Sequence, residues 1–225
     1  QQLSVMTLRN GATVYIWEDK SKPDVFGMIA FKVGSVDDPE QYTGLAHYLE
    51  HVMFKGTQTI DALDWEKEKP IYEKIIAKYD ERAALSDPAA REAIDKEIND
   101  LTREAAQYAA GNEFSLLVDH MGGQGLNAST GYDQTEYHNS FPPSQLEKWL
   151  EIYSERLIGP VFRGFQTELE AVYEEYNMYN DDRGSRMREF IYEQAFGDHP
   201  YARPIIGLPE HLKNPQLSKL IDFYN

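Results

Sequence analysis

The sequence contains no cysteine among its 225 residues. Disulfide bonds, thiolate nucleophiles and zinc–sulfur sites are therefore excluded, and a metal ion would have to be bound by histidine, aspartate or glutamate. Long apolar runs are also missing, since the longest covers only residues 25–31. A helix that crosses a bilayer needs about 20 apolar residues, so the sequence predicts no membrane span.

Basic residues are scarce. There are 22 lysines and arginines against 38 aspartates and glutamates, which gives a net charge of −16. An acidic surface repels phosphate backbones, so we expect no binding to nucleic acid. The acidic excess favours solubility first and basic substrates second. Hydrophobic residues make up 41% of the chain, which is ordinary for a globular protein that buries a core.

The N-terminal part of the chain has the composition of strands. Asn10-Gly11 separates the first two strand-like segments and predicts a tight hairpin. A helix is predicted over residues 43–54, with Thr43 as its N-cap. The expected strands cover residues 5–8, 12–17 and 26–33.

Residues 61–111 have the pattern of a helical hairpin. Apolar residues recur at helical spacing on both sides of Asp87 and Pro88, which predict the start of the second helix. Two strands, residues 125–130 and 135–141, and two helices, residues 144–157 and 166–179, are predicted further along. We therefore expect one α+β domain over residues 1–225, with the hairpin as an insertion.

The chemistry is concentrated in His47, Glu50 and His51, which lie at positions i, i+3 and i+4 of the predicted helix. At about 100° per residue, the three side chains share one helix face. Two imidazoles one turn apart can bind one metal ion, and the glutamate is placed to take a proton from a metal-bound water. This is the inverted zincin pattern, but two histidines at this spacing are also common on ordinary helix surfaces.

Four segments, in order, resemble the pitrilysin-type zinc metallopeptidases (inverzincins, M16), which include mitochondrial processing peptidase and bacterial zinc proteases. They are Gly44 to Thr57, Asn127 to Thr130, Glu168 to Glu175 and His199 to Gly207. The resemblance covers nearly all of the chain except residues 61–111. It implies the N-terminal catalytic domain of such a peptidase, with the LuxS/MPP-like metallohydrolase fold: a mainly antiparallel sheet covered by helices.

A third metal ligand is needed, because zinc peptidases usually bind zinc through three protein side chains and leave the fourth position to water. The candidates are Glu168, Glu170, Glu174 and Glu175. The family pattern implies Glu175, with Glu174 as the alternative one position away. Glu168, seven residues before Glu175, is then implied to be a carboxylate that orients a ligand, or else a solvated glutamate.

The resemblance also implies where substrate binds. Asn127, Ala128 and Ser129 would form an edge strand to which an extended peptide adds by main-chain pairing. Phe54 would line a pocket beside the scissile bond, with simple core packing as the alternative. The remaining histidines with no ligand spacing are expected to be structural or exposed: His120, His138, His199 and His211.

The function implied is that of a zinc-dependent (Zn2+) endopeptidase that hydrolyses peptides or unfolded protein segments, with the zinc-bound water activated by Glu50. The alternative is a non-catalytic zinc-binding partner subunit of a peptidase assembly. By resemblance, residues 220–225 precede the domain's last strands, and a second peptidase-like half or subunit closes the chamber. The usual location of family members and the Gln1 start favour a bacterial periplasmic location. We also expect that the metal site does not need residues 61–111.

Overall fold

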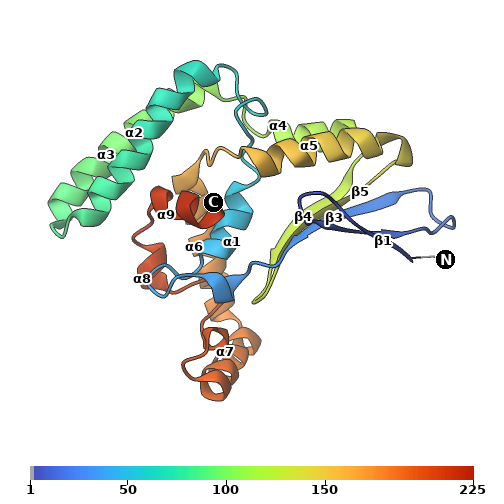
Figure 1. The fold of residues 1–225 in the computed structure, drawn as a ribbon. Helices are drawn as coiled ribbons and strands as arrows, with labels where there is room; N and C mark the ends of the chain where they lie inside the picture. The colour runs from blue at the N-terminus through green and yellow to red at the C-terminus, as the bar shows by residue number, and fades with distance from the viewer. Residues whose placement is uncertain (1–2) are drawn as a thin grey trace.

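A computed structural model describes residues 3–225 of the chain. Its helices and strands are mixed along the sequence, and all strand pairs are antiparallel, which confirms the predicted α+β class (Figure 1). No helix among these residues has the length and apolar character to cross a membrane. The elements are β1 Leu3–Thr7, β2 Thr13–Trp17, β3 Val25–Phe31, α1 Leu45–Val52, α2 Trp65–Ala84, α3 Pro88–Ala105, α4 Glu113–His120, β4 Gln124–Thr130, β5 Thr135–Phe141, α5 Leu146–Ile158, α6 Phe165–Asp181, α7 Arg183–Phe196, α8 Pro209–Leu212 and α9 Leu217–Tyr224.

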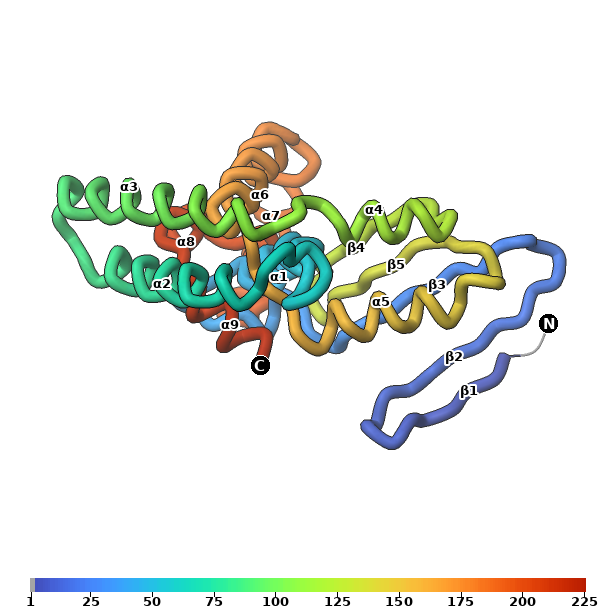
Figure 2. The backbone as a smooth tube through the Cα atoms, turned by 90° about the horizontal axis from the view of Figure 1, so that it is seen from above, coloured from blue at the N-terminus to red at the C-terminus, as the bar shows by residue number. Residues whose placement is uncertain are grey.

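A three-stranded sheet with the order β3-β5-β4 forms the centre of the fold. Helices α4 and α5 lie side by side over one face of this sheet (Figures 1 and 2). Helix α5 packs tightly against β3. A Cβ added at Gly27 of β3 would lie 2.6 Å from the ring of Trp149 on α5. β4 pairs only with β5 within the described residues, so one of its edges is open.

The first two strands form a separate antiparallel hairpin. Gly11 at its turn has a φ of +87°, a conformation that suits glycine and supports the expected Asn10-Gly11 turn. In Figure 2 this hairpin lies apart from the three-stranded sheet and its covering helices. The predicted N-terminal strands are confirmed, but in residues 3–225 they do not form one continuous sheet.

Helix α1 begins at Leu45, two residues after the predicted start. Thr43 was expected to cap it, and that prediction is wrong, because the Thr43 hydroxyl instead accepts a hydrogen bond from the Leu208 amide at 2.8 Å. The buried carboxylate of Asp38 takes the capping role and accepts hydrogen bonds from the amides of Gly44 and Ala46 at 2.7 and 2.8 Å. This cap comes from a separate turn, which helix-start patterns do not reveal.

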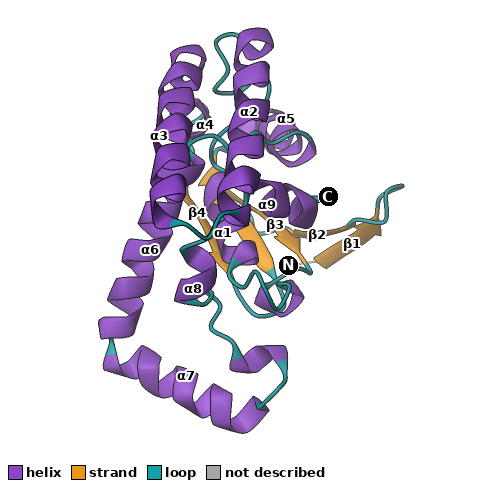
Figure 3. Ribbon diagram, turned by 90° about the vertical axis from the view of Figure 1, so that its left-hand side faces the viewer, coloured by secondary structure: helices purple, strands orange, loops and turns teal. Residues whose placement is uncertain are grey.

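The predicted helical hairpin is present as α2 and α3, which run side by side at one end of the molecule (Figures 1 and 3), and α2 also contacts α6 and α9. Asp87 accepts hydrogen bonds from the amides of Ala89 and Ala90, which confirms its role as N-cap. At the base, the Leu63 amide donates to the Tyr108 carbonyl oxygen at 2.7 Å. The outgoing and returning segments are therefore joined where the hairpin leaves the domain.

A buried arginine on α5 supports the end of α1. The guanidinium of Arg156 lies 4.2 Å from the ring centre of Phe54 and 4.4 Å from that of Tyr137. Its Nε donates a hydrogen bond to the Met53 carbonyl oxygen at 2.9 Å, at the C-terminal cap of α1. Burial lowers the pKa of Arg156 to about 10, so the side chain stays charged at neutral pH.

Replacing Arg156 by alanine should strongly destabilise the domain. The substitution leaves a cavity between aromatic rings, removes the cation–π contacts and leaves the Met53 carbonyl without its partner. We expect a loss of about 3 kcal/mol, which corresponds to a fall in Tm of roughly 6–12 °C for a domain of this size. Thermal denaturation of Arg156→Ala beside the exposed control Arg103→Ala measures it. Equal Tm values for the two variants would show that the contacts of Arg156 contribute little to the stability of the domain.

Candidate metal centre

Helices α1 and α6 bring three candidate ligands together. His47 and His51 lie one turn apart on α1, and Glu175 lies on α6. Glu175 Oε2 is 3.6 Å from His47 Nε2 and 3.5 Å from His51 Nε2. One ligand atom from each of the three residues lies within 4.8 Å of the other two. Two helices that are far apart in sequence thus bring their candidate ligands together.

The spacing of these atoms suits a zinc ion. Zinc binds histidine nitrogen and carboxylate oxygen at about 2.0–2.2 Å, and two such ligands of a tetrahedral site lie roughly 3.4 Å apart. The separations of 3.5 and 3.6 Å between Glu175 and the two imidazoles are close to this value. Two imidazoles and one carboxylate also form the ligand set of many catalytic zinc sites, which keep a fourth position open.

Glu174 has different surroundings. Its side chain faces a groove of about 490 Å³ that is also lined by Arg82, Asp95 and Lys213. Glu175, the next residue, faces α1 and both histidines. Of the two alternatives for the third ligand, the helix therefore turns Glu175 toward the candidate metal position and Glu174 elsewhere.

Two further side chains surround His51. Glu168 Oε2 lies 3.5 Å from His51 Nδ1, the ring nitrogen that faces away from Glu175. Lys55 Nζ lies 2.5 Å from the other carboxylate oxygen of Glu168. An acceptor on one imidazole nitrogen orients the ring and leaves the other nitrogen for metal. Glu168 thus lies where the resemblance implies an orienting carboxylate, whereas the sequence reasoning missed Lys55.

Burial and the nearby carboxylates shift the pKa values of the two histidines in opposite directions. Burial, aided by His51, lowers the pKa of His47 to about 4, while Glu175 opposes the shift. Burial also acts to lower the pKa of His51, but hydrogen bonds with Glu168 and Glu175 outweigh it and raise that pKa to about 9. His47 is therefore neutral at pH 7, the form in which imidazole binds a metal ion.

Glu50 lies on the same side of α1 as the two histidines and is buried. Thr130 Oγ1, at the end of β4, donates a hydrogen bond to Glu50 Oε2 at 2.5 Å. Burial raises the pKa of Glu50, and the Thr130 hydrogen bond opposes that rise. One carboxylate oxygen is thus held by the sheet. Thr130 ends the Asn127-Ala128-Ser129-Thr130 segment, but sequence reasoning had not assigned it a role.

The expected substrate strand is part of β4. Asn127 and Ser129 are exposed, Ala128 is buried, and all three pair with β5 along one edge of the strand. The opposite edge of β4 has no strand partner among residues 3–225. Because Thr130 contacts Glu50, the C-terminal end of β4 lies beside the candidate metal centre.

Phe54, for which a pocket position and core packing were the two alternatives, is partly buried. Its ring packs against Arg156 and lies 6.1 and 6.2 Å from the rings of Phe114 and Tyr137. These contacts agree with the alternative of core packing. Of the other histidines, His138 lies 5.3 Å from the Phe26 ring and His211 hydrogen-bonds to Thr43, so both make structural contacts.

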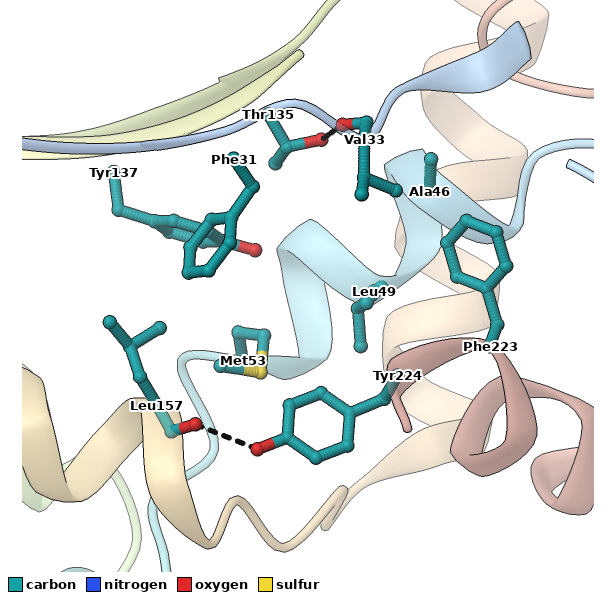
Figure 4. A pocket seen from close by; sticks show the side chains of 10 residues that line it. All are labelled: Phe31, Val33, Ala46, Leu49, Met53, Thr135, Tyr137, Leu157, Phe223 and Tyr224. Atoms are coloured by element: carbon teal, nitrogen blue, oxygen red, sulfur yellow. Dashed lines mark hydrogen bonds between the residues drawn. The ribbon is translucent and has the colours of Figure 1, made fainter. Parts of the chain in front are cut away.

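A small apolar cavity of about 120 Å³ lies behind α1, on the side opposite the ligands. Figure 4 shows Leu49 of α1 and Met53, its C-cap residue, facing Tyr224 of α9 across it, with Tyr137 on the sheet side. The Tyr224 hydroxyl donates to the Leu157 carbonyl oxygen at 2.7 Å and closes one end. The cavity has no metal-binding side chain in its lining, so it belongs to the packing of α1 rather than to the metal centre.

The arrangement defines a class of protein. A helix with the His-x-x-Glu-His pattern, joined by a glutamate from a second helix, is typical of inverted-zincin metallopeptidases. The family model for insulinase, peptidase family M16, matches residues 13–69 and 98–208. The chain therefore belongs to peptidase family M16. The residues between the two matched parts, 70–97, fall within the helical hairpin and are fewer than the expected insertion of residues 61–111.

Curated relatives include bacterial zinc proteases. The zinc protease PqqE of Helicobacter pylori is 25% identical over 224 residues, which cover 98% of this chain and 39% of the relative. An uncharacterized zinc protease of Mycobacterium leprae is 25% identical over 194 residues, or 85% of this chain and 32% of the relative. The chain thus spans about a third to two fifths of the length of these proteins.

Solved structures share the fold. A crystal structure of a protease from Helicobacter pylori matches with a TM-score of 0.72 at 22% identity, covering 99% of this chain and 42% of that one. The first half of the periplasmic protease PqqL from Escherichia coli matches with a TM-score of 0.69 at 22% identity, covering 99% and 39%. Pitrilysin matches with a TM-score of 0.67. At this identity the likeness establishes the pitrilysin-type fold.

Proposed function

We propose that the chain is the catalytic part of a zinc-dependent endopeptidase, with His47, His51 and Glu175 as zinc ligands and Glu50 as general base. The observation that supports it most is the meeting of three ligand atoms within 4.8 Å, beside a glutamate held by the edge strand. The names of the curated relatives, zinc proteases, agree with this chemistry.

The side chains around the proposed zinc site have separate roles in the proposed reaction. A bound zinc ion would supply Lewis acidity, which makes water a stronger nucleophile at neutral pH and polarises a carbonyl group. Glu50 accepts the proton that the attacking water loses and returns it to the leaving amine. Thr130 holds one oxygen of Glu50, so the other is free for the proton. Glu168 orients His51 through its Nδ1 nitrogen.

The substrate is proposed to be an extended peptide or an unfolded protein segment. Asn127, Ala128 and Ser129 pair with β5 on one side, and the main-chain groups of β4 that alternate to its open edge are left for an added strand. Such pairing uses the main-chain groups of the peptide, so peptides of many different sequences can bind in this way. It also leads the peptide past Thr130 toward Glu50 and the proposed zinc ligands.

Two assays on the same preparation test the proposal. Metal analysis should find about one zinc per chain, and peptide hydrolysis should disappear with a chelator and return with added zinc. A protein that binds zinc but cleaves no peptide, alone or with its partner, would support the alternative, a non-catalytic zinc-binding subunit. A protein that binds no zinc would contradict both functions.

We also propose that a second peptidase-like half or subunit closes over the site. The chain spans only 39% of the zinc protease PqqE and matches the first half of PqqL over 99% of its own length. The PqqL structure is described as that of a periplasmic protease. That description favours a bacterial periplasmic location for this chain as well.

Residues 1–225 alone should therefore bind zinc but cleave peptides slowly. Without a second half, the site lacks an enclosing wall and further donors for the developing oxyanion, and the loss of one such donor costs about 10²–10³ in rate. The measurement is peptide turnover by the isolated chain, with and without the remainder of its parent protein or a separately encoded partner. Full-rate cleavage by the isolated chain would refute the two-half arrangement.

A further inference from the structure

The root of the helical hairpin contains a buried ion pair that the proposed reaction does not use. Glu68 on α2 is 1% exposed, and Arg163, just before α6, is 9% exposed. Arg163 Nε and Nη2 lie 2.6 and 2.8 Å from the two carboxylate oxygens of Glu68, so the contact is bidentate. A buried pair of this geometry fixes the relative position of the two segments that carry it.

This ion pair is connected to both ligand-bearing helices. Arg163 Nη1 donates to the Lys55 carbonyl oxygen at 3.2 Å, just after the end of α1. Gly164, the next residue after Arg163, is the N-cap of α6. The Val161 amide also donates to the Gly56 carbonyl oxygen at 3.1 Å. The exit of α1 and the entry of α6 are thus joined at one place, next to the hairpin.

The contacts continue to a proposed zinc ligand. The Lys55 ammonium lies 2.5 Å from Glu168 Oε1, and Glu168 Oε2 lies 3.5 Å from His51 Nδ1. A chain of polar contacts therefore runs from Glu68 through Arg163, Lys55 and Glu168 to His51. Each link joins charged or strongly polar groups, and the first link is shielded from water.

We propose that Glu68 and Arg163 are positioning residues for the metal centre, which they serve by holding Lys55 and the start of α6 in place. The inference rests on the proposed zinc site. It also gives the root of the hairpin a role, since Glu68 lies on α2. The expectation that all of residues 61–111 are dispensable is thereby revised, because their removal would take away Glu68, the carboxylate that holds Arg163 in place.

A second contact of the hairpin supports the same conclusion. The Tyr79 ring on α2 lies 4.8 Å from the Phe165 ring, the first residue of α6. The Phe165 carbonyl oxygen accepts a hydrogen bond from the Tyr48 hydroxyl on α1. The hairpin, α6 and α1 therefore meet at Phe165, almost three turns before Glu175 and two residues after Arg163 of the ion pair.

The test measures zinc affinity by competition with a chelator, together with the visible spectrum of the cobalt(II)-substituted protein, which reports ligand geometry. In Glu68→Gln we expect zinc to bind about tenfold more weakly and the cobalt spectrum to change, because loss of an orienting partner costs about 10–100-fold. The matched control is Glu66→Gln, an exposed glutamate half a turn away on α2. It should match the wild type in both measurements.

Two more variants separate positioning from folding. Glu68→Met combined with Arg163→Met removes both charges, so no buried charge is left unpaired and the protein should fold. Lys55→Met breaks the link at a side chain that is one third exposed. Both should bind zinc about tenfold more weakly than the wild type. A purely structural role would lower Tm and leave the cobalt spectrum of the folded protein unchanged.

The outcomes distinguish this inference from the proposed function. If the wild-type protein binds zinc and either folded variant binds it equally well with the same cobalt spectrum, the positioning role is wrong and the zinc site stands. If the wild-type protein binds no zinc, the proposed function fails, and the positioning role fails with it. Weaker binding in both variants, with the control unchanged, supports the role of the ion pair.

Discussion

Glu50→Gln is expected to keep zinc bound while peptide turnover falls by about 10²–10⁴-fold, the usual contribution of a general base. Glutamine has the same shape and can still accept the hydrogen bond that the Thr130 hydroxyl donates to Glu50 Oε2. It cannot take a proton from the attacking water at neutral pH. Zinc content and kcat, measured on the same preparation, check both parts of the expectation.

The matched control for this substitution is Thr130→Val, which removes the hydrogen bond to Glu50 and keeps the carboxylate. We expect a smaller loss of activity, about tenfold, since the base is still present but less firmly oriented. Glu50→Gln should also allow an uncut peptide to be captured on the open edge of β4. Turnover by Glu50→Gln within a few-fold of the wild type would show that another group is the base.

The ligands on α1 could be predicted from sequence because their relation is local. A helix places residues i, i+3 and i+4 on one face wherever it lies, so His47, Glu50 and His51 needed no tertiary information. Glu175 is different. It is 124 residues beyond His51 (175 − 51), and only the resemblance to M16 peptidases connected the two. The distances between the two helices come from packing, which periodicity does not encode.

The missed residues share one physical cause. Asp38 caps α1 from a preceding turn, Thr130 reaches Glu50 from a strand, and Lys55 pairs with Glu168 on another helix. Each interaction joins separate elements through one polar side chain. Such contacts leave no periodic pattern in the chain. The same holds for Glu68 and Arg163, which stand 95 residues apart and appeared in the sequence only as two charges among many.

The secondary structure was easier to predict, because its signals are repetitive. β5 was expected at residues 135–141 and has these bounds, and Asp87 caps α3 as predicted. The arrangement of strands was less accessible. The sequence suggested one sheet, whereas the β1–β2 hairpin and the β3-β5-β4 sheet are separate within the described residues. Pairing between distant strands depends on the tertiary structure and not on the composition of each strand.

Removing one zinc ligand should have the second large effect. His51→Ala leaves His47 and Glu175 as the remaining ligands, and the chain has no cysteine that could replace the lost imidazole. Loss of a side chain that only orients a ligand already weakens zinc binding by about 10–100-fold. Loss of a direct ligand should therefore weaken binding by more than the upper end of this range. Metal analysis after dialysis should find zinc in the wild type and almost none in His51→Ala, with peptide hydrolysis lost as well.

The comparison of Glu175→Ala with Glu174→Ala makes this test specific. Both residues lie on the same turn of α6 and both are exposed, so the two substitutions change the surface and the net charge equally. Only Glu175 lies within 3.6 Å of both imidazoles, whereas Glu174 faces the groove beside the hairpin. Glu175→Ala should therefore lose zinc while Glu174→Ala keeps it. The reverse result would mean that α6 is rotated by one residue, and full zinc in both variants would mean that the third ligand lies elsewhere.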